Sequence, residues 1–253
     1  MPCRHHLWAV VLILSGCGSF LHRADNFEQG LNSYNNKQYD EAVNHFKAYH
    51  DEHPTHDSTL YYLFNCYKQL NKSQEQILVL EKLVSIGVDD ENVYLNLIYF
   101  YRKHERYSDV YNSLLRFSPL TEEHEIKYWP LTRGFFAELI CGAVAHDTKT
   151  DPMIFCVTRG YLPLFPDGQQ YQDDTLTQAS LIMLLDRLLE PTYPRNFHPM
   201  KHISTKSYLY LPYMRLVDSG ILQFDPYLTP DEYARVSMAT HALEKLHKRG
   251  HLD

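Results

Sequence analysis

One spacing in the first part of the chain constrains its fold more than any other feature. Gly30, Ala42, Phe46 and Pro54 follow one another at intervals of 12, 4 and 8 residues. Small residues allow two antiparallel helices to cross closely, and an aromatic ring between them fills the remaining gap. Proline ends a helix because it lacks an N–H group and clashes with the preceding turn. The spacing therefore predicts a helical hairpin over residues 23–54.

Two further copies of the hairpin follow at a shift of about 34 residues. Their apolar residues recur at the positions i, i+3, i+4 and i+7, which is the period of a helix packed along one side. These residues are Leu60, Leu63, Tyr67, Leu80 and Leu83 in the second copy, and Tyr94, Leu97, Tyr101, Val110, Leu114 and Phe117 in the third. The array, residues 26–120, resembles the tetratricopeptide repeat family.

This resemblance implies a protein-binding surface. Arrays of this family are curved, and the first helix of each pair lines a concave face that binds an extended peptide or a helix. The register of the family places five residues on that face: Tyr61, Asn65, Lys68, Tyr99 and Arg102. The alternative interpretation is a solvated face that binds nothing.

The second half of the chain contains three segments of similar form. The clearest, residues 154–189, combines Arg159-Gly160-Tyr161-Leu162 with Phe165-Pro166-Asp167-Gly168 and Leu176-Thr177-Gln178-Ala179. Gly160 permits a left-handed turn after a helix, and Thr177 is suited to cap the next helix. In residues 208–246, Thr229-Pro230-Asp231-Glu232 predicts a capping box that opens a helix. A reduced copy begins with Leu131-Thr132-Arg133-Gly134.

Residues 128–247 resemble S-layer-homology motifs. The resemblance implies three helical lobes around a pseudo-threefold axis that bind cell-wall glycan, peptidoglycan or another wall polysaccharide. In that family an arginine at the helix start grips an acidic sugar. Arg133 keeps this residue, whereas Gln178 and Pro230 stand at the positions expected to be equivalent.

The N-terminus carries the signature of export and lipidation. A basic head and an apolar run over residues 7–14 are typical of a signal peptide, and the run is shorter than the ~20 apolar residues that span a bilayer. Leu14-Ser15-Gly16-Cys17 resembles the lipobox of bacterial lipoproteins. This implies a signal peptide over 1–16, a lipid-modified Cys17 and a tether over 17–25. Gly18 favours the outer membrane over the inner one. An ordinary cleaved signal peptide is the alternative.

Charge and motif content exclude several classes of function. The net charge is −7 without a Lys/Arg cluster, which argues against a nucleic-acid partner. No catalytic or nucleotide-binding motif is present, and we expect no enzyme activity, cofactor or catalytic residue. Histidines 45, 50, 53 and 56 could hold a metal, but a solvated turn is the interpretation that we favour, and no metal site is predicted. Cys66, Cys141 and Cys156 are expected to be buried thiols, with a Cys141–Cys156 disulfide as the alternative.

Together these patterns predict an all-α protein: an array of helical hairpins followed by a three-lobed helical unit. The function predicted from them is that of a lipid-anchored, non-catalytic adaptor of the cell envelope, which binds an envelope protein and wall glycan. The alternative is a pilotin-like factor for the assembly of a secretion, pilus or outer-membrane complex.

Overall fold

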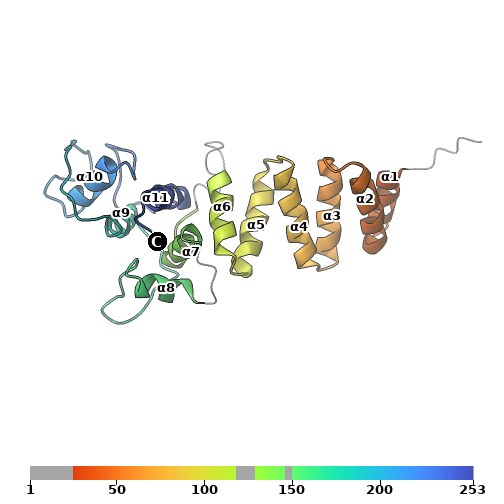
Figure 1. The fold of residues 1–253 in the computed structure, drawn as a ribbon, viewed down its shortest axis with the longest axis horizontal. Helices are drawn as coiled ribbons and strands as arrows, with labels where there is room; N and C mark the ends of the chain where they lie inside the picture. The colour runs from red at the N-terminus through yellow and green to blue at the C-terminus, as the bar shows by residue number, and fades with distance from the viewer. Residues whose placement is uncertain (1–24, 118–128, 146–149, 253) are drawn as a thin grey trace, which may run out of the picture. The chain divides into compact units, whose positions relative to one another are not determined.

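The computed structural model describes residues 25–117, 129–145 and 150–252. Within these ranges the chain forms eleven helices, and its only β-structure is three isolated bridges, which confirms the predicted all-α class (Figure 1). The chain divides into two compact units between Ile86 and Gly87. The predicted signal peptide and Cys17 lie outside the described residues, as does the expected boundary at 120–128.

The first unit is a pair of helical hairpins. It consists of α1 (Asn26–Asn35), α2 (Tyr39–Glu52), α3 (Asp57–Gln69) and α4 (Ser73–Ser85). Each helix packs against the next, and the four run alternately in opposite directions (Figure 1). Helix α2 ends before Pro54, where the sequence predicts its end.

The crossing of α1 and α2 depends on Gly30. A Cβ atom at this position would lie 2.6 Å from the ring of Phe46, closer than van der Waals contact permits. Phe46 and Ala42 are both fully buried. The glycine therefore makes room for the aromatic ring that fills this hairpin, as the spacing of the two residues indicates.

The described residues of the second unit form seven helices: α5 (Glu91–Lys103), α6 (Tyr107–Phe117), α7 (Arg133–Ala143), α8 (Pro152–Thr158), α9 (Gln178–Asp186), α10 (Tyr210–Asp218) and α11 (Val236–Lys248). Helices α5 and α6 form the third hairpin. Helix α6 packs on both α7 and α11, so this hairpin belongs to the same compact unit as the three C-terminal segments (Figure 1).

A second glycine determines how closely α7 approaches α6. A Cβ atom on Gly142 would lie 2.4 Å from the carbonyl oxygen of Tyr107 and 2.6 Å from Cβ of Tyr111. The first of these is a backbone atom, which cannot rotate away. Only glycine allows the two helices to approach this closely.

Three short extended segments join the helices of the second unit in a closed ring. The N–H of Leu131 donates to the carbonyl of Ala234 at 2.9 Å. The N–H of Ala234 donates to Leu176 at 2.8 Å, and the N–H of Leu176 donates back to Leu131 at 2.8 Å. All three side chains are buried. Each segment thus donates one hydrogen bond and accepts one, so the ring has approximate threefold symmetry.

Each ring segment leads directly into a helix. Thr132 caps α7 by accepting from the N–H of Phe135 at 3.1 Å. Thr177 caps α9 by accepting from the N–H of Ser180 at 3.2 Å, which confirms its predicted role. The predicted turn after α8 is also confirmed, because Gly160 has a φ of +77°.

The third helix start differs from the prediction. Helix α11 begins at Val236, so the capping box expected at Thr229 and Glu232 was wrong. Pro230 does not begin a helix, and Val236 is the residue equivalent to Arg133 and Gln178. The reason is that the ring holds residues 233–235 in extended form, so the helix cannot begin before them. Instead, the carbonyl of Pro230 accepts from the N–H of Ala179 at the start of α9.

Candidate functional site

The candidate site is a cavity of about 430 Å³ in the second unit. The loop after α8, the second ring segment and helix α9 contribute its walls, and Arg133 contributes from the first turn of α7. The lining residues are Arg133, Pro163, Phe165, Asp174, Thr175, Leu176, Ser180, Met183, Leu184, Asp186 and Arg187.

Arg133 is the most constrained side chain of this cavity. It is only 4% exposed, and its guanidinium donates to the carbonyl of Pro163 and lies 4.7 Å from the centre of the Phe165 ring. Its Nε atom is buried without a hydrogen-bond partner. Burial lowers the pKa of this guanidinium, and the carboxylate of Asp174 partly offsets that effect. A buried donor without a partner is costly.

The first turn of α7 is held by the strand-like segment that precedes α9. The N–H of Arg133 donates to the carbonyl of Asp174 at 2.9 Å, and the N–H of Gly134 donates to Gln172 at 2.7 Å. A Cβ on Gly134 would lie 3.0 Å from that Gln172 oxygen. The backbone thus positions Arg133 independently of any contact that its side chain makes.

An aromatic loop borders the cavity and a smaller adjoining hollow of about 370 Å³. The rings of Phe165 and Tyr171 meet edge to face at 4.9 Å, and both are partly exposed. The hydroxyl of Tyr171 donates to the carboxylate of Asp167, which lowers the pKa of that carboxyl and raises the pKa of the phenol. An aromatic surface beside hydrogen-bonding groups can stack on the apolar face of a sugar ring while its hydroxyls are bound.

The sequence pointed to Arg133 but not to the other walls of the cavity. Phe165 was identified as part of a loop motif, without a binding role. Ser180 lies in α9 and Arg187 directly follows its last residue, and no motif distinguishes them from other residues of the segment. Their spacing of seven places them on one side of the helix, which is the only signal that could have grouped them with the cavity.

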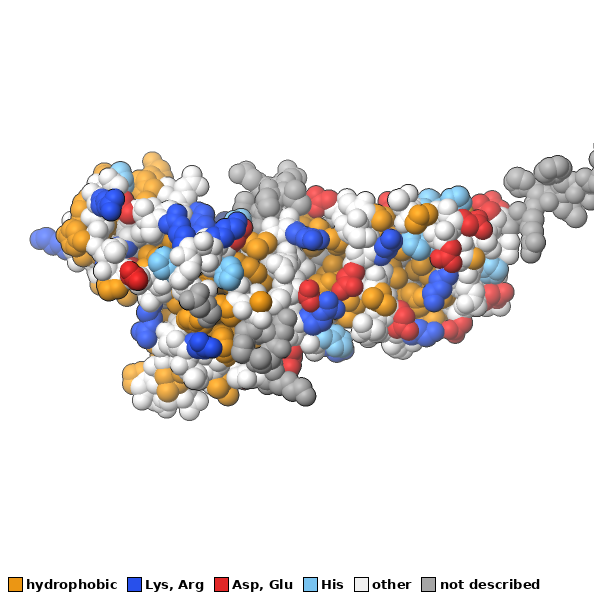
Figure 2. Space-filling model, in the orientation of Figure 1, with side chains coloured by type: hydrophobic (Ala, Val, Ile, Leu, Met, Phe, Trp, Pro, Cys, Tyr) orange, Lys and Arg blue, Asp and Glu red, His pale blue; other side chains and the backbone are white. Residues whose placement is uncertain are grey.

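Another surface of the second unit is rich in aromatic and cationic side chains. Residues 191–209, between α9 and α10, contain three Lys/Arg residues and no Asp or Glu. Tyr193, Phe197 and Tyr208 are all substantially exposed, and hydrophobic side chains reach the surface in the α10 region (Figure 2). Asp218 anchors this segment by accepting from the N–H of Asn196 at 3.0 Å and its amide at 2.7 Å, contacts that lower the pKa of the Asp218 carboxyl.

The five predicted protein-binding residues fall into two groups. Tyr61, Asn65 and Lys68 follow one another along one side of α3, in the first unit, and none of them is buried. Tyr99 and Arg102 lie on α5, in the second unit, where Tyr99 is 62% exposed. Each unit therefore carries its own part of the predicted surface.

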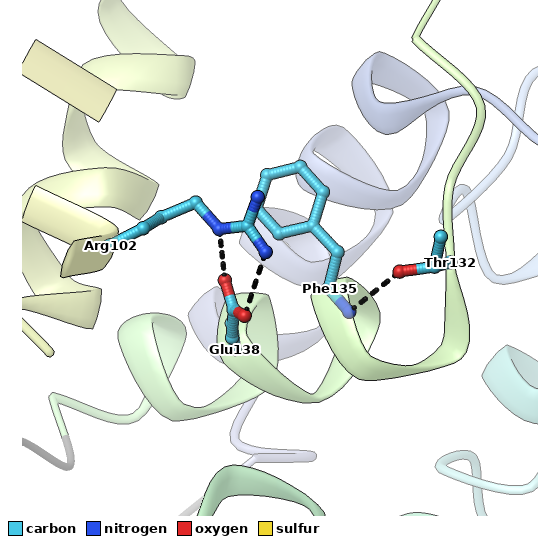
Figure 3. A network of polar contacts seen from close by, with 4 residues as sticks. All are labelled: Arg102, Thr132, Phe135 and Glu138. Carbon is cyan, nitrogen blue, oxygen red and sulfur yellow. Dashed lines mark hydrogen bonds and ion pairs between the residues drawn. The ribbon is translucent and has the colours of Figure 1, made fainter. Parts of the chain in front are cut away.

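Arg102 makes extensive contacts within the second unit. Its Nε and Nη2 atoms donate to the two carboxylate oxygens of Glu138 on α7 at 2.6 and 2.9 Å (Figure 3). The guanidinium also lies 4.3 Å from the centre of the Phe135 ring. The hydrogen bond with Glu138 raises the pKa of Arg102. These contacts tie the third hairpin to α7, a role that the sequence did not suggest.

The histidine-rich segment has local structural roles. His56 caps α3 by accepting from the N–H of Thr59, and the ring of His53 packs 4.3 Å from that of Tyr49. Burial lowers the pKa of His50, and the nearby Lys82 adds to this effect. Among the residues that the structure describes, no group of three or more His, Cys, Asp or Glu is placed to hold a metal ion.

Two further observations concern membrane-spanning helices and similarity to known proteins. In the described ranges, none of the helices combines the length and apolarity needed to cross a bilayer. Compared with protein-family models and with curated proteins, the sequence matches neither a family nor a characterised protein.

Proposed function

We propose that this chain is a lipid-anchored, non-catalytic binding protein of the bacterial cell envelope, whose second unit binds wall glycan in the Arg133 cavity. The observation that carries the proposal is the buried guanidinium of Arg133, whose Nε lacks a partner at the wall of a cavity of about 430 Å³. A ligand in the cavity that carries acceptor groups would bind beside this guanidinium.

The lining of the cavity favours a glycan over an apolar ligand. Thr175 and Ser180 offer hydroxyl groups, Arg187 offers a second cation, and Phe165 offers a ring. Asp174 and Asp186 balance the two cations, and Asp186 already forms an ion pair with Arg215 on α10, at 2.5 Å. This mixture of hydroxyls, both charges and one ring suits a sugar with few acidic groups, such as the glycan of peptidoglycan.

The test uses Arg187, because it is exposed and its substitution leaves the buried core intact. The purified full chain, its Arg187→Ala variant and an Arg159→Ala control are sedimented with purified peptidoglycan. Arg159 is also exposed, but it lies at the end of α8 and does not line the cavity. We expect Arg187→Ala to reduce co-sedimentation several-fold and Arg159→Ala to leave it unchanged.

Two results would count against glycan binding in the cavity. Equal sedimentation of all three proteins would place any binding elsewhere. If none of them sediments, the assembly-factor interpretation becomes preferable, with the three lobes as a surface that docks a protein subunit.

Attachment to the membrane is tested separately at Cys17. Cys17→Ser removes the thiol that would receive the lipid, and we expect the protein to leave the detergent-soluble membrane fraction or to remain an unprocessed precursor. Intact mass of the unaltered protein, purified from membranes of its host, measures the modification directly. An unmodified Cys17 in that sample would contradict the lipoprotein assignment.

The hairpins are proposed to recruit an envelope protein. Tyr61, Asn65 and Lys68 offer an aromatic ring, an amide and a cation on the same side of α3, a combination that can bind the backbone and carboxylates of a peptide. A photo-crosslinking residue at position 65 in the living host would trap this partner. A residue placed at position 75 on α4 serves as the control, and equal labelling by both would contradict a specific surface on α3.

A further inference from the structure

Two of the three described cysteines lie on helices that pack against each other. Cys141 is in the last turns of α7 and Cys156 is in α8, and both are buried within the second unit. Cys66 is also buried, but it belongs to α3 in the first unit. Cys66 therefore serves as an internal comparison for Cys141 and Cys156.

The two thiols of the second unit meet at one turn of α7. The sulfur of Cys156 lies 3.6 Å from the carbonyl oxygen of Ala137. In a helix this carbonyl accepts from the N–H four residues later, which is that of Cys141, so the Cys156 sulfur is beside the turn that carries Cys141. The two thiol groups therefore lie close enough to interact, and their interaction raises the pKa of the Cys156 thiol.

We propose that Cys141 and Cys156 form a structural disulfide bond that fixes α8 to α7. The bond would join two side chains that interact across the packed helices α7 and α8. It would join the helix that carries Arg133 to the helix that leads into the Phe165 loop, and thus the two elements that meet at the cavity.

The oxidant is a disulfide donor, RSSR, of the class that exchanges thiols outside the cytoplasm. The thiolate of one cysteine attacks the donor, forms a mixed disulfide and releases RS⁻. The thiolate of the second cysteine then attacks the protein sulfur of that mixed disulfide and releases a second RS⁻. The two protons lost by the cysteines are taken up by the two RS⁻ ions, so two protein thiols and RSSR give one protein disulfide and two RSH.

The timing of this reaction follows from burial. The contact with Cys141 raises the pKa of the Cys156 thiol, and burial raises it further, so Cys156 carries little thiolate in the folded protein. Because thiolate is the attacking species, exchange is fast only while α7 and α8 are still open to solvent. The bond is therefore expected to form during folding and to resist reduction afterwards.

Refolding in a defined thiol buffer tests the proposal without reference to cellular location. The full chain is denatured, reduced and refolded in a mixture of reduced and oxidised glutathione, then acidified, alkylated under denaturing conditions and digested with trypsin. Cleavage after Arg133, Lys149 and Arg159 separates Cys141 from Cys156. We expect peptides 134–149 and 150–159 to remain linked, and Cys66 to be alkylated.

Single variants identify the partners. Cys66→Ser should leave the link unchanged, whereas Cys141→Ser should leave Cys156 alkylated or joined to glutathione. Alkylation of Cys66, Cys141 and Cys156 together in the unaltered chain would overturn the proposal, as would a link that includes Cys66. Glycan binding is measured independently of this result, so failure of the bond and failure of the proposed function can be distinguished.

Discussion

Gly142 shows how a single missing side chain can position a helix. Its neighbour across the contact is the carbonyl oxygen of Tyr107, and an added methyl group would collide with it at 2.4 Å. The backbone of α6 or α7 would have to shift to relieve this collision. The sequence offers no way to see this contact, because the two residues are 35 positions apart and belong to different predicted elements.

Gly142→Ala should therefore destabilise the second unit by roughly 1–3 kcal/mol through overpacking. Asn112→Ala, at an exposed position of α6, is the control and should change the stability by less than about 0.5 kcal/mol. Both are measured by urea unfolding followed by circular dichroism. Equal midpoints for the two variants would show that α6 and α7 do not approach as closely as described.

Cys66 makes the first unit sensitive to alkaline pH. Burial raises the pKa of its thiol from 9.0 to about 11, so the folded state favours the protonated form. Since the unfolded chain loses this proton first, the contribution is fully present below pH 9 and is lost as the pH rises toward 11.

The difference in unfolding free energy between the unaltered chain and Cys66→Ala isolates this effect from other groups. We expect the difference to be constant below about pH 8 and to shift in favour of the variant between pH 9 and 11. A difference that stays flat across this range would mean that the thiol is accessible to water in the folded protein.

At the scale of single elements, an ion pair joins two helices of the second unit. Arg102 and Glu138 join α5 to α7 with two hydrogen bonds, and the stacking on Phe135 adds a third contact (Figure 3). Paired, planar geometry of this kind is stronger than a single contact between flexible side chains. The pair adds a polar contact between α5 and α7 to the packing of α6 on α7 and α11.

A double-mutant cycle with Arg102→Ala and Glu138→Ala should give a coupling energy of about 1 kcal/mol, because Glu138 is mostly buried while Arg102 is half exposed. The exposed pair of Lys248 and Glu244, within α11, is the matched control and should give about 0.3–0.5 kcal/mol. If the two couplings are equal, the pair on α5 and α7 contributes no more than a surface ion pair.

The helix starts show what local sequence can and cannot reveal. Thr177 precedes an apolar helical stretch, and its role as a cap follows from residue type alone. Thr229 and Glu232 have equally good local chemistry, yet the chain directly after them is held extended at residues 233–235, where Ala234 bonds to Leu131 and Leu176. Long-range pairing overrides a capping signal whose worth is about 1 kcal/mol, and that pairing leaves no trace in a local pattern.

At the scale of the whole molecule, the hairpin periodicity correctly predicted the all-α class, and Pro54 correctly predicted the end of α2. The periodicity did not reveal where the chain divides into units, because α5 and α6 share the period of α1–α4. What distinguishes the third hairpin is its partner: α6 packs on α7 and α11. Such contacts depend on the shapes of surfaces far apart in sequence, which a repeat pattern does not encode. The cavity was predictable only at Arg133 for the same reason.

A fragment of residues 87–253 should therefore fold as a cooperative helical unit. A fragment of residues 128–253 lacks α6 and would expose the apolar sides of α7 and α11. We expect the shorter fragment to bind the dye ANS and to unfold at a lower temperature than the full chain. The longer fragment should not bind ANS and should not unfold at a lower temperature than the full chain. The melting curves of both fragments are compared with that of the full chain, and identical melting of the two would argue against the division at residue 86.

The ring of three hydrogen bonds has a consequence for how this protein is made. Leu131 cannot complete its pairing until Ala234 has been synthesised, because each member of the ring needs both of the others. A nascent chain that ends between Leu131 and Ala234 leaves the amide of Leu131 without its native partner. The second unit therefore cannot reach its final structure until Ala234 has been added. The second unit is therefore completed only after most of the chain has been synthesised, whereas the hairpins α1–α4 of the first unit need no residue beyond 86.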